Sequence, residues 1–113
     1  MATEAFSGTE TVGTTEWSMT TDTAGPDADT TAGVYQAFLD MSALAAGDTF
    51  TFAVYEKVLA AGTQRLVYSV GFAGAQNSPH FTTPPLILIH GWDMTLVKTA
   101  GTDRSISWSI RTP

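Results

Sequence analysis

The sequence has no cysteine among its 113 residues. This absence excludes a thiol nucleophile, a thiolate metal site and a disulfide framework, and it is compatible with synthesis in a reducing cytoplasm. No apolar stretch approaches the roughly 20 residues that a membrane-spanning helix needs. The first residues also lack the basic and apolar regions of a secretion signal. We therefore expect neither membrane insertion nor signal-directed export.

Positive charge is missing from residues 1–32, although the whole chain carries a net charge of −6. The acids of this segment are Glu4, Glu10, Glu16, Asp22, Asp27 and Asp29. An acidic segment repels phosphate backbones and anionic membranes, so we expect no nucleic acid and no membrane as a partner. A basic protein surface suits it better, and a solubilising tail is the alternative.

The same segment is rich in Thr and Gly and poor in apolar residues. We interpret residues 1–32 as an acidic N-terminal arm with one or two weak strands, and residues 33–113 as the folded body. Four apolar arm residues are candidates for binding a partner: Phe6, Val12, Trp17 and Met19. Trp17 has polar neighbours, and either docking into a partner or covering an edge of its own body explains it.

From Gly33 onward, apolar and polar residues alternate in short runs, which is typical of β-strands. The predicted strands are 34–40, 49–58, 65–72, 86–89, 92–98 and 105–110. The turns 57–65 and 98–104 both contain Gly-Thr between a Lys and an Arg, and each predicts a β-hairpin. The fold class expected is all-β, an antiparallel β-sandwich of jelly-roll or immunoglobulin-like kind.

The alternation also predicts which side chains are buried. Residues 86–89 are apolar throughout, which favours a central strand covered on both sides. In the next strand Trp92 should point inward, and Asp93 should point outward; Trp108 should lie in the core of the last strand. The Pro-containing segment 75–85 is expected to be a surface crossover outside the sheets, with Asn77, His80 and Phe81 as candidate functional residues.

Catalytic and metal-binding patterns are weak in this chain. The sequence His90-Gly91 after an apolar strand resembles the oxyanion turn of an α/β hydrolase, but no Gly-x-Ser-x-Gly elbow accompanies it. The two histidines, His80 and His90, have no second ligand at metal-binding spacing. We predict a protein that is not an enzyme and that uses no cofactor and no metal.

The segment Leu86-Ile-Leu-Ile-His-Gly-Trp-Asp-Met-Thr-Leu-Val-Lys98, followed by Ala-Gly-Thr-Asp-Arg-Ser-Ile-Ser-Trp-Ser-Ile110, carries a family resemblance. With Ala46-Gly-Asp-Thr and Tyr55-Glu-Lys, it resembles small tailed-bacteriophage virion proteins of the capsid decoration (cement) type. The resemblance covers roughly residues 33–111. It implies a homotrimer on the capsid exterior, made in the bacterial cytoplasm, that binds the major capsid protein and stabilises contacts between its subunits.

Two other functions remain open at this point. One is a carbohydrate- or receptor-binding module of a tail or fibre, with the loop near residues 74–85 facing the ligand. The other is a head–tail or tail-tube component. Copy number separates decoration from the tail roles. If the arm makes the capsid contact, deleting residues 1–20 should abolish capsid binding and leave the body folded.

Overall fold

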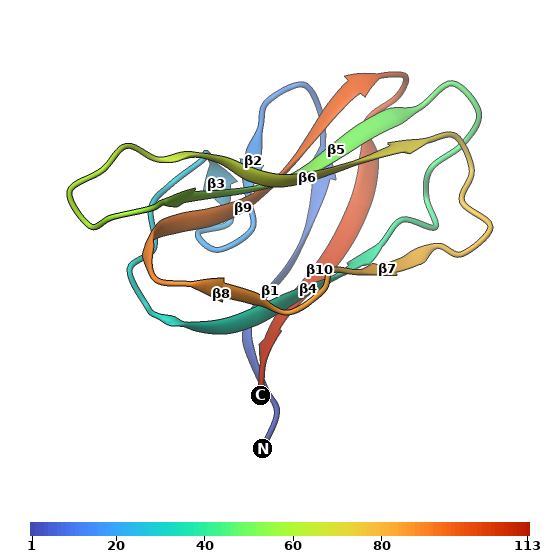
Figure 1. Cartoon of the computed structure of the whole chain (residues 1–113). Coiled ribbons are helices and arrows are strands. Elements are labelled where there is room, and N and C mark those ends of the chain that lie inside the picture. Colours follow the sequence, from blue (N-terminus) through green and yellow to red (C-terminus); the bar gives the residue numbers. More distant parts are fainter.

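The computed structural model describes all residues, 1–113, and its secondary structure is entirely β (Figure 1). Two five-stranded antiparallel sheets pack into a sandwich, as predicted. Sheet A has the order β1-β10-β4-β7, with β8 also paired to β4, and sheet B has the order β3-β2-β9-β5-β6. The strands are β1 (Thr3–Val12), β2 (Trp17–Ser18), β3 (Thr23–Ala24), β4 (Gly33–Asp40), β5 (Thr49–Lys57), β6 (Arg65–Ala73), β7 (His80–Thr82), β8 (Leu86–Leu88), β9 (His90–Ala100) and β10 (Arg104–Thr112).

The core lies between the two sheets and is built by the predicted alternation. Every second residue of β4, from Tyr35 to Leu39, is buried, and Phe50, Phe52 and Val54 of β5 are inaccessible to solvent. Trp92 of β9 lies at the centre, with its ring 4.5 Å from that of Tyr35. Burial of these large apolar surfaces is the main stabilising contribution to the fold.

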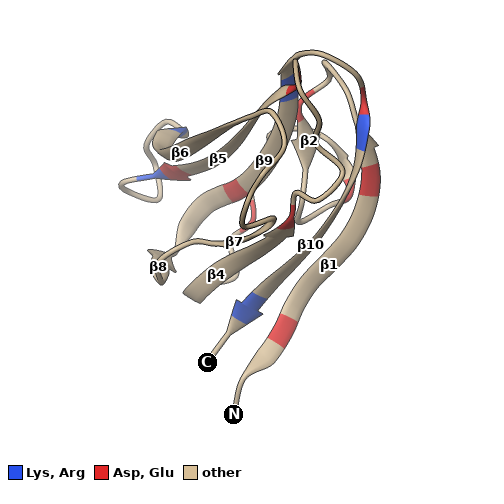
Figure 2. Cartoon of the chain, turned by 90° about the vertical axis from the view of Figure 1, so that its right-hand side faces the viewer, with Lys and Arg blue, Asp and Glu red and all other residues tan.

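The division into an arm and a body is wrong, because β1 is a full strand of sheet A. It pairs with β10 from Thr3 to Val12, along the whole of its length, and Figure 2 shows it as the outermost strand. Val12 and Met19 are each 1% exposed and belong to the core. Gly8 makes this packing possible, since its missing side chain leaves space for the Trp108 indole. Ser7, Thr9 and Thr11 form the exposed outer face of this strand, which accounts for its hydroxyl-rich sequence.

The first predicted hairpin is confirmed and the second is wrong. β5 and β6 pair around the first turn, with Glu56 opposite Arg65. β9 and β10, by contrast, belong to different sheets, so the turn at Gly101 carries the chain from sheet B to sheet A. Asp48 holds this turn by accepting hydrogen bonds from Thr102 N (2.9 Å) and Arg104 Nε (2.6 Å). These bonds, the one from Thr102 above all, lower the pKa of Asp48 to about 2.

The outer face of β9 is buried, contrary to the prediction for Asp93. The segment 16–29 folds over this face, and Asp93 accepts hydrogen bonds from Thr20 Oγ1 and Asp27 N, both 2.7 Å long. Glu16 of the same segment accepts bonds from Tyr55 Oη (2.6 Å) and from a hydroxyl of β9. Asp93 and Thr95 of β9 can be buried because the N-terminal segment supplies their partners: donors from Thr20 and Asp27 for the carboxylate, and the Glu16 carboxylate for the hydroxyl.

Two other burial predictions fail at the ends of strands. β8 is an edge strand rather than a central one, and Ile87 is 72% exposed. The alternation of the predicted strand 49–58 places Val58 on the same inward face as Phe50, Phe52 and Val54, but Val58 is 86% exposed because the β5–β6 hairpin extends beyond the core (Figure 1). The segment 75–85 is not all loop: residues 80–82 between its prolines pair with β4 as a short edge strand. An edge position tolerates flanking prolines, since its outer backbone groups need no ladder partner.

Candidate functional site

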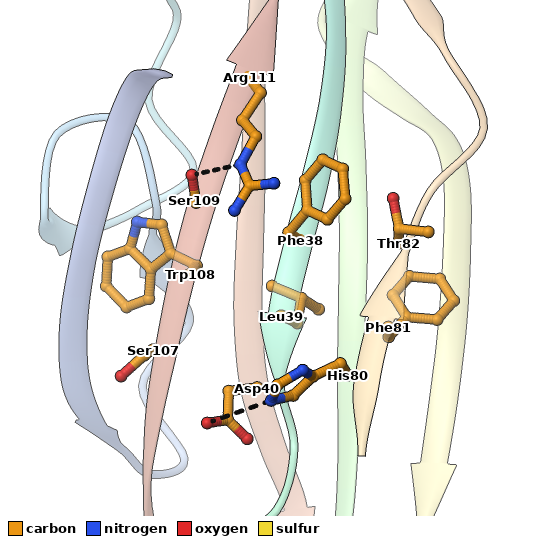
Figure 3. A pocket seen from close by; sticks show the side chains of 10 residues that line it. All are labelled: Phe38, Leu39, Asp40, His80, Phe81, Thr82, Ser107, Trp108, Ser109 and Arg111. Atoms are coloured by element: carbon orange, nitrogen blue, oxygen red, sulfur yellow. Dashed lines mark hydrogen bonds and ion pairs between the residues drawn. The ribbon is translucent and has the colours of Figure 1, made fainter. Parts of the chain in front are cut away.

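An open groove with a volume of about 550 Å³ lies on the outer face of sheet A (Figure 3). It crosses β10, β4 and β7, so three segments far apart in the sequence form its walls. The lining residues are Phe38, Leu39, Asp40, His80, Phe81, Thr82, Ser107, Trp108, Ser109 and Arg111. A concave surface of this size, lined by aromatic, hydroxyl and charged side chains, is the first candidate for a ligand site.

The strand register explains which side chains reach the groove. Ser107 pairs with Asp40 and Ser109 pairs with Phe38, and paired residues of neighbouring strands project on the same side of a sheet. Trp108 and its neighbours of the opposite phase point into the core. The outer face of β10 is therefore a row of hydroxyls that ends in Arg111.

Arg111 is held in a fixed orientation at one end of the groove. Its guanidinium lies 4.0 Å from the centre of the Phe38 ring, and its Nε donates to Ser109 Oγ over 3.1 Å. Ser109 Oγ in turn donates to a carboxylate oxygen of Glu4. No ion pair joins Arg111 to an acid, and its two terminal nitrogens lie between Ser109 and Phe38 in Figure 3. The cation is thus oriented with its terminal donors unused.

A carboxylate and an imidazole form the other end. Asp40 Oδ2 lies 3.8 Å from His80 Nε2, and both side chains are exposed. Hydrogen bonds from Ser42 lower the pKa of Asp40, with a smaller contribution from His80. Asp40 is therefore ionised at neutral pH and accepts hydrogen bonds. Asp40 pairs with Ser107, and Arg111 follows Ser107 by four residues on β10. The positions of Asp40 and Arg111 are therefore about 13 Å apart along the strand direction.

Of the predicted crossover residues, the structure places two at the groove. His80 and Phe81 line it, whereas Asn77 is exposed in the preceding loop and does not take part. The groove residues that the sequence did not single out include Phe38 and Asp40 on β4 and Arg111 on β10. The alternating serines of β10 were a usable signal, because Arg111 continues the same outward phase.

None of the four predicted arm residues is presented to a partner. Val12 and Met19 are core residues, and the Phe6 ring packs 5.9 Å from that of Trp92. Trp17 packs against the core, and its indole donates to Asp22 over 3.0 Å. The structure therefore favours, for Trp17, the alternative in which it covers its own sheet.

A second exposed feature, the apolar end, lies at the β5–β6 hairpin and the neighbouring β8 (Figure 1). Pairing of Lys57 with His90, and a hydrogen bond from Ile89 N to Glu56 (2.6 Å), bring the end of β8 to the base of the hairpin. The apolar end consists of Val58 (86% exposed), Leu59 (70%), Leu66 (54%), Val67 (50%), Ile87 (72%) and Ile89 (44%). Apart from Met1, these are all the exposed large hydrophobic residues of the chain.

The remaining acids do not gather into a metal-binding cluster. No three His, Cys, Asp or Glu side chains lie close enough together to hold a metal ion. The carboxylate oxygens of Asp93 and Glu16 accept hydrogen bonds from other groups of the fold, so these two side chains stabilise the structure. The chain also forms no helix of the length and apolarity needed to cross a membrane.

Comparison with known proteins gives little similarity. No family model and no curated protein match the chain. Among solved structures, it is similar to the TNF protein Eiger from S. frugiperda, with 15% sequence identity and a TM-score of 0.42 over 72% of this chain. The match spans 59% of that protein. At this level the similarity implies nothing about function, and the resemblance to phage decoration proteins stays a prediction.

Proposed function

We propose that the protein is a non-enzymatic capsid decoration protein that binds the outer surface of the expanded phage head and stabilises contacts between major capsid subunits. The observation that carries this proposal is the apolar end. Several large hydrophobic residues exposed at one end of a molecule are typical of a protein–protein interface. The family resemblance names the capsid as the partner, and the homotrimeric state belongs to the same proposal.

The geometry of the apolar end suits docking into a depression between subunits. The β5–β6 hairpin extends away from the core, so Val58 and Leu59 at its tip contribute little to the fold itself. Lys57 and Arg65 flank the tip, while Glu56 is occupied by the backbone of Ile89 and His90. A partner surface with an apolar centre and an acidic rim would complement this end.

This docking surface replaces the N-terminal arm as the contact element. Residues 1–20 include β1 and two core residues, Val12 and Met19, so deleting them should unfold the sandwich instead of releasing a folded body. Loss of capsid binding in such a deletion would therefore report unfolding.

The test is co-sedimentation of purified protein with expanded, undecorated heads. The double variant Val58→Asp/Leu59→Asp should lose at least tenfold in affinity, because it places two charges in an apolar contact. The control Ala43→Asp/Ala46→Asp adds the same charges to the exposed loop at the opposite end and should bind like the wild type. Equal binding by both variants, or no binding of the wild-type protein, would exclude docking through the apolar end.

A second candidate function is a carbohydrate- or receptor-binding module, which the groove on sheet A favours. The groove combines exposed hydroxyls with an oriented cation whose terminal nitrogens have no partner in the fold, which suits a polar ligand. The two functions differ in copy number: decoration requires copies in proportion to the capsid protein, whereas a tail or head–tail module needs far fewer.

A further inference from the structure

We propose that the groove on sheet A binds a saccharide that bears a carboxylate, with Arg111 holding the carboxylate and Asp40 and His80 holding sugar hydroxyls. This inference rests on the second candidate function and names its ligand class. It is independent of docking through the apolar end.

The first step of the argument is the state of Arg111. An arginine that is stacked on an aromatic ring and hydrogen-bonded through Nε has lost most of its side-chain freedom before any ligand arrives. Its terminal nitrogens are the two that form a fork with a planar carboxylate. Since no acid of the chain occupies that fork, a ligand carboxylate can do so.

The second step concerns the charge that the ligand can carry. Glu4 meets Arg111 through Ser109, and Asp40 lies at the other end of the groove. These two acids would repel a phosphate or a polyphosphate more strongly than a singly charged carboxylate. The groove therefore favours one negative charge at the Arg111 end only.

The third step is the polar surface beside these groups. Ser107, which pairs with Asp40 and whose hydroxyl also contacts that of Thr9, and Thr82, which pairs with Phe38, are exposed hydroxyls that both donate and accept hydrogen bonds, which matches the hydroxyls of a sugar. The floor of the groove is a sheet face, and the edge strand beside it, β7, is only three residues long, so the groove offers little free backbone ladder for a peptide strand. The separation of about 13 Å between Asp40 and Arg111 leaves room for a short oligosaccharide rather than one sugar ring.

The experiment is an NMR titration of the isotopically labelled wild-type protein with two acidic probes that each carry a single carboxylate, cellobiouronate and 3′-sialyllactose, and with neutral lactose. At least one acidic probe should shift the signals of Phe38, Asp40 and Arg111, and lactose should bind at least tenfold more weakly. Arg111→Gln should weaken the acidic probe at least tenfold. Arg65→Gln removes an exposed arginine from the distant hairpin and should leave its affinity unchanged.

Three results would overturn the inference: no shift with either acidic probe, equal affinity for lactose, or acidic binding that survives Arg111→Gln. Equal affinity for lactose would leave a general carbohydrate-binding role standing while removing the carboxylate. Co-sedimentation with heads separates the two proposals, because Arg111→Gln should bind heads like the wild type whatever the outcome with sugars.

Discussion

Substitution of Gly8 by alanine tests whether the N-terminal segment is an integral part of the sandwich. A Cβ atom at this position would lie 2.6 Å from Cζ2 of the Trp108 indole, well inside van der Waals contact. Trp108 cannot easily move away, because it is 4% exposed and its indole nitrogen donates to the Met19 carbonyl over 3.0 Å. The methyl group must therefore displace β1 or distort the Trp108 rotamer.

Overpacking of this kind costs about 1–3 kcal/mol of unfolding free energy. For a chain of 113 residues, an unfolding entropy of about 2.1 cal/mol/K per residue gives about 0.24 kcal/mol/K in total. The expected drop in Tm of Gly8→Ala is therefore about 4–12 °C.

The assay is thermal and urea unfolding followed by tryptophan fluorescence, with Gly71→Ala as the matched control. Gly71 also lies in a strand, and nothing comes within 4 Å of a Cβ built on it. That control should be unchanged or up to about 1 kcal/mol more stable, since alanine restricts the unfolded chain. Equal stability of Gly8→Ala and wild type would refute the packing of β1 against Trp108 and restore the independent arm.

Three further predictions concern pH and the surface. The pKa of Asp48 is about 2, below its ordinary 3.8, so the stability that its ionised form contributes is present above pH 3.8 and is lost as the pH falls through about 2. Urea unfolding over this pH range should show that loss. Asp48→Asn should lower the unfolding free energy at pH 7 and make it depend less on pH below 3.8. Burial, and then Glu16, raises the pKa of Tyr55 to about 12, so stability should fall as the pH rises from 10 toward 12. An absorbance titration of tyrosinate should show Glu16→Gln ionising at lower pH, and an unchanged curve would exclude the Glu16 contact. Leu59→Ser at the exposed hairpin tip should change the unfolding free energy by less than about 0.5 kcal/mol, and a larger loss in urea would mean that the tip is packed.

The sequence predicts the structure correctly for strands that have one buried face and one solvent-exposed face. In β4, β5 and β10 the alternation alone identifies the core, from Tyr35 to Ile110. The same rule misassigns Asp93, because a polar residue normally faces water and only the tertiary fold places Thr20 and the backbone of Asp27 near it. Such a burial depends on partners more than sixty residues away, which no local pattern contains.

The order of the strands in the two sheets is the second feature that the sequence does not predict correctly. A Gly-containing turn between two strands is compatible with a hairpin and with a change of sheet, and the buried contact of Asp48 with the Gly101 turn decides between them. For the groove, too, the sequence predicts one part and the strand pairing determines the rest. Its serine row is visible in the alternation of β10, but the position of Phe38 beside Arg111 follows from the pairing of β10 with β4.

Counting bound copies on expanded, undecorated heads tests the proposed function most directly. If the protein is a capsid decoration protein, binding should saturate near one copy per major capsid subunit, with the added protein sedimenting as a trimer before it binds. No binding, or saturation at a few copies per head, would contradict decoration and favour a tail or saccharide-binding role.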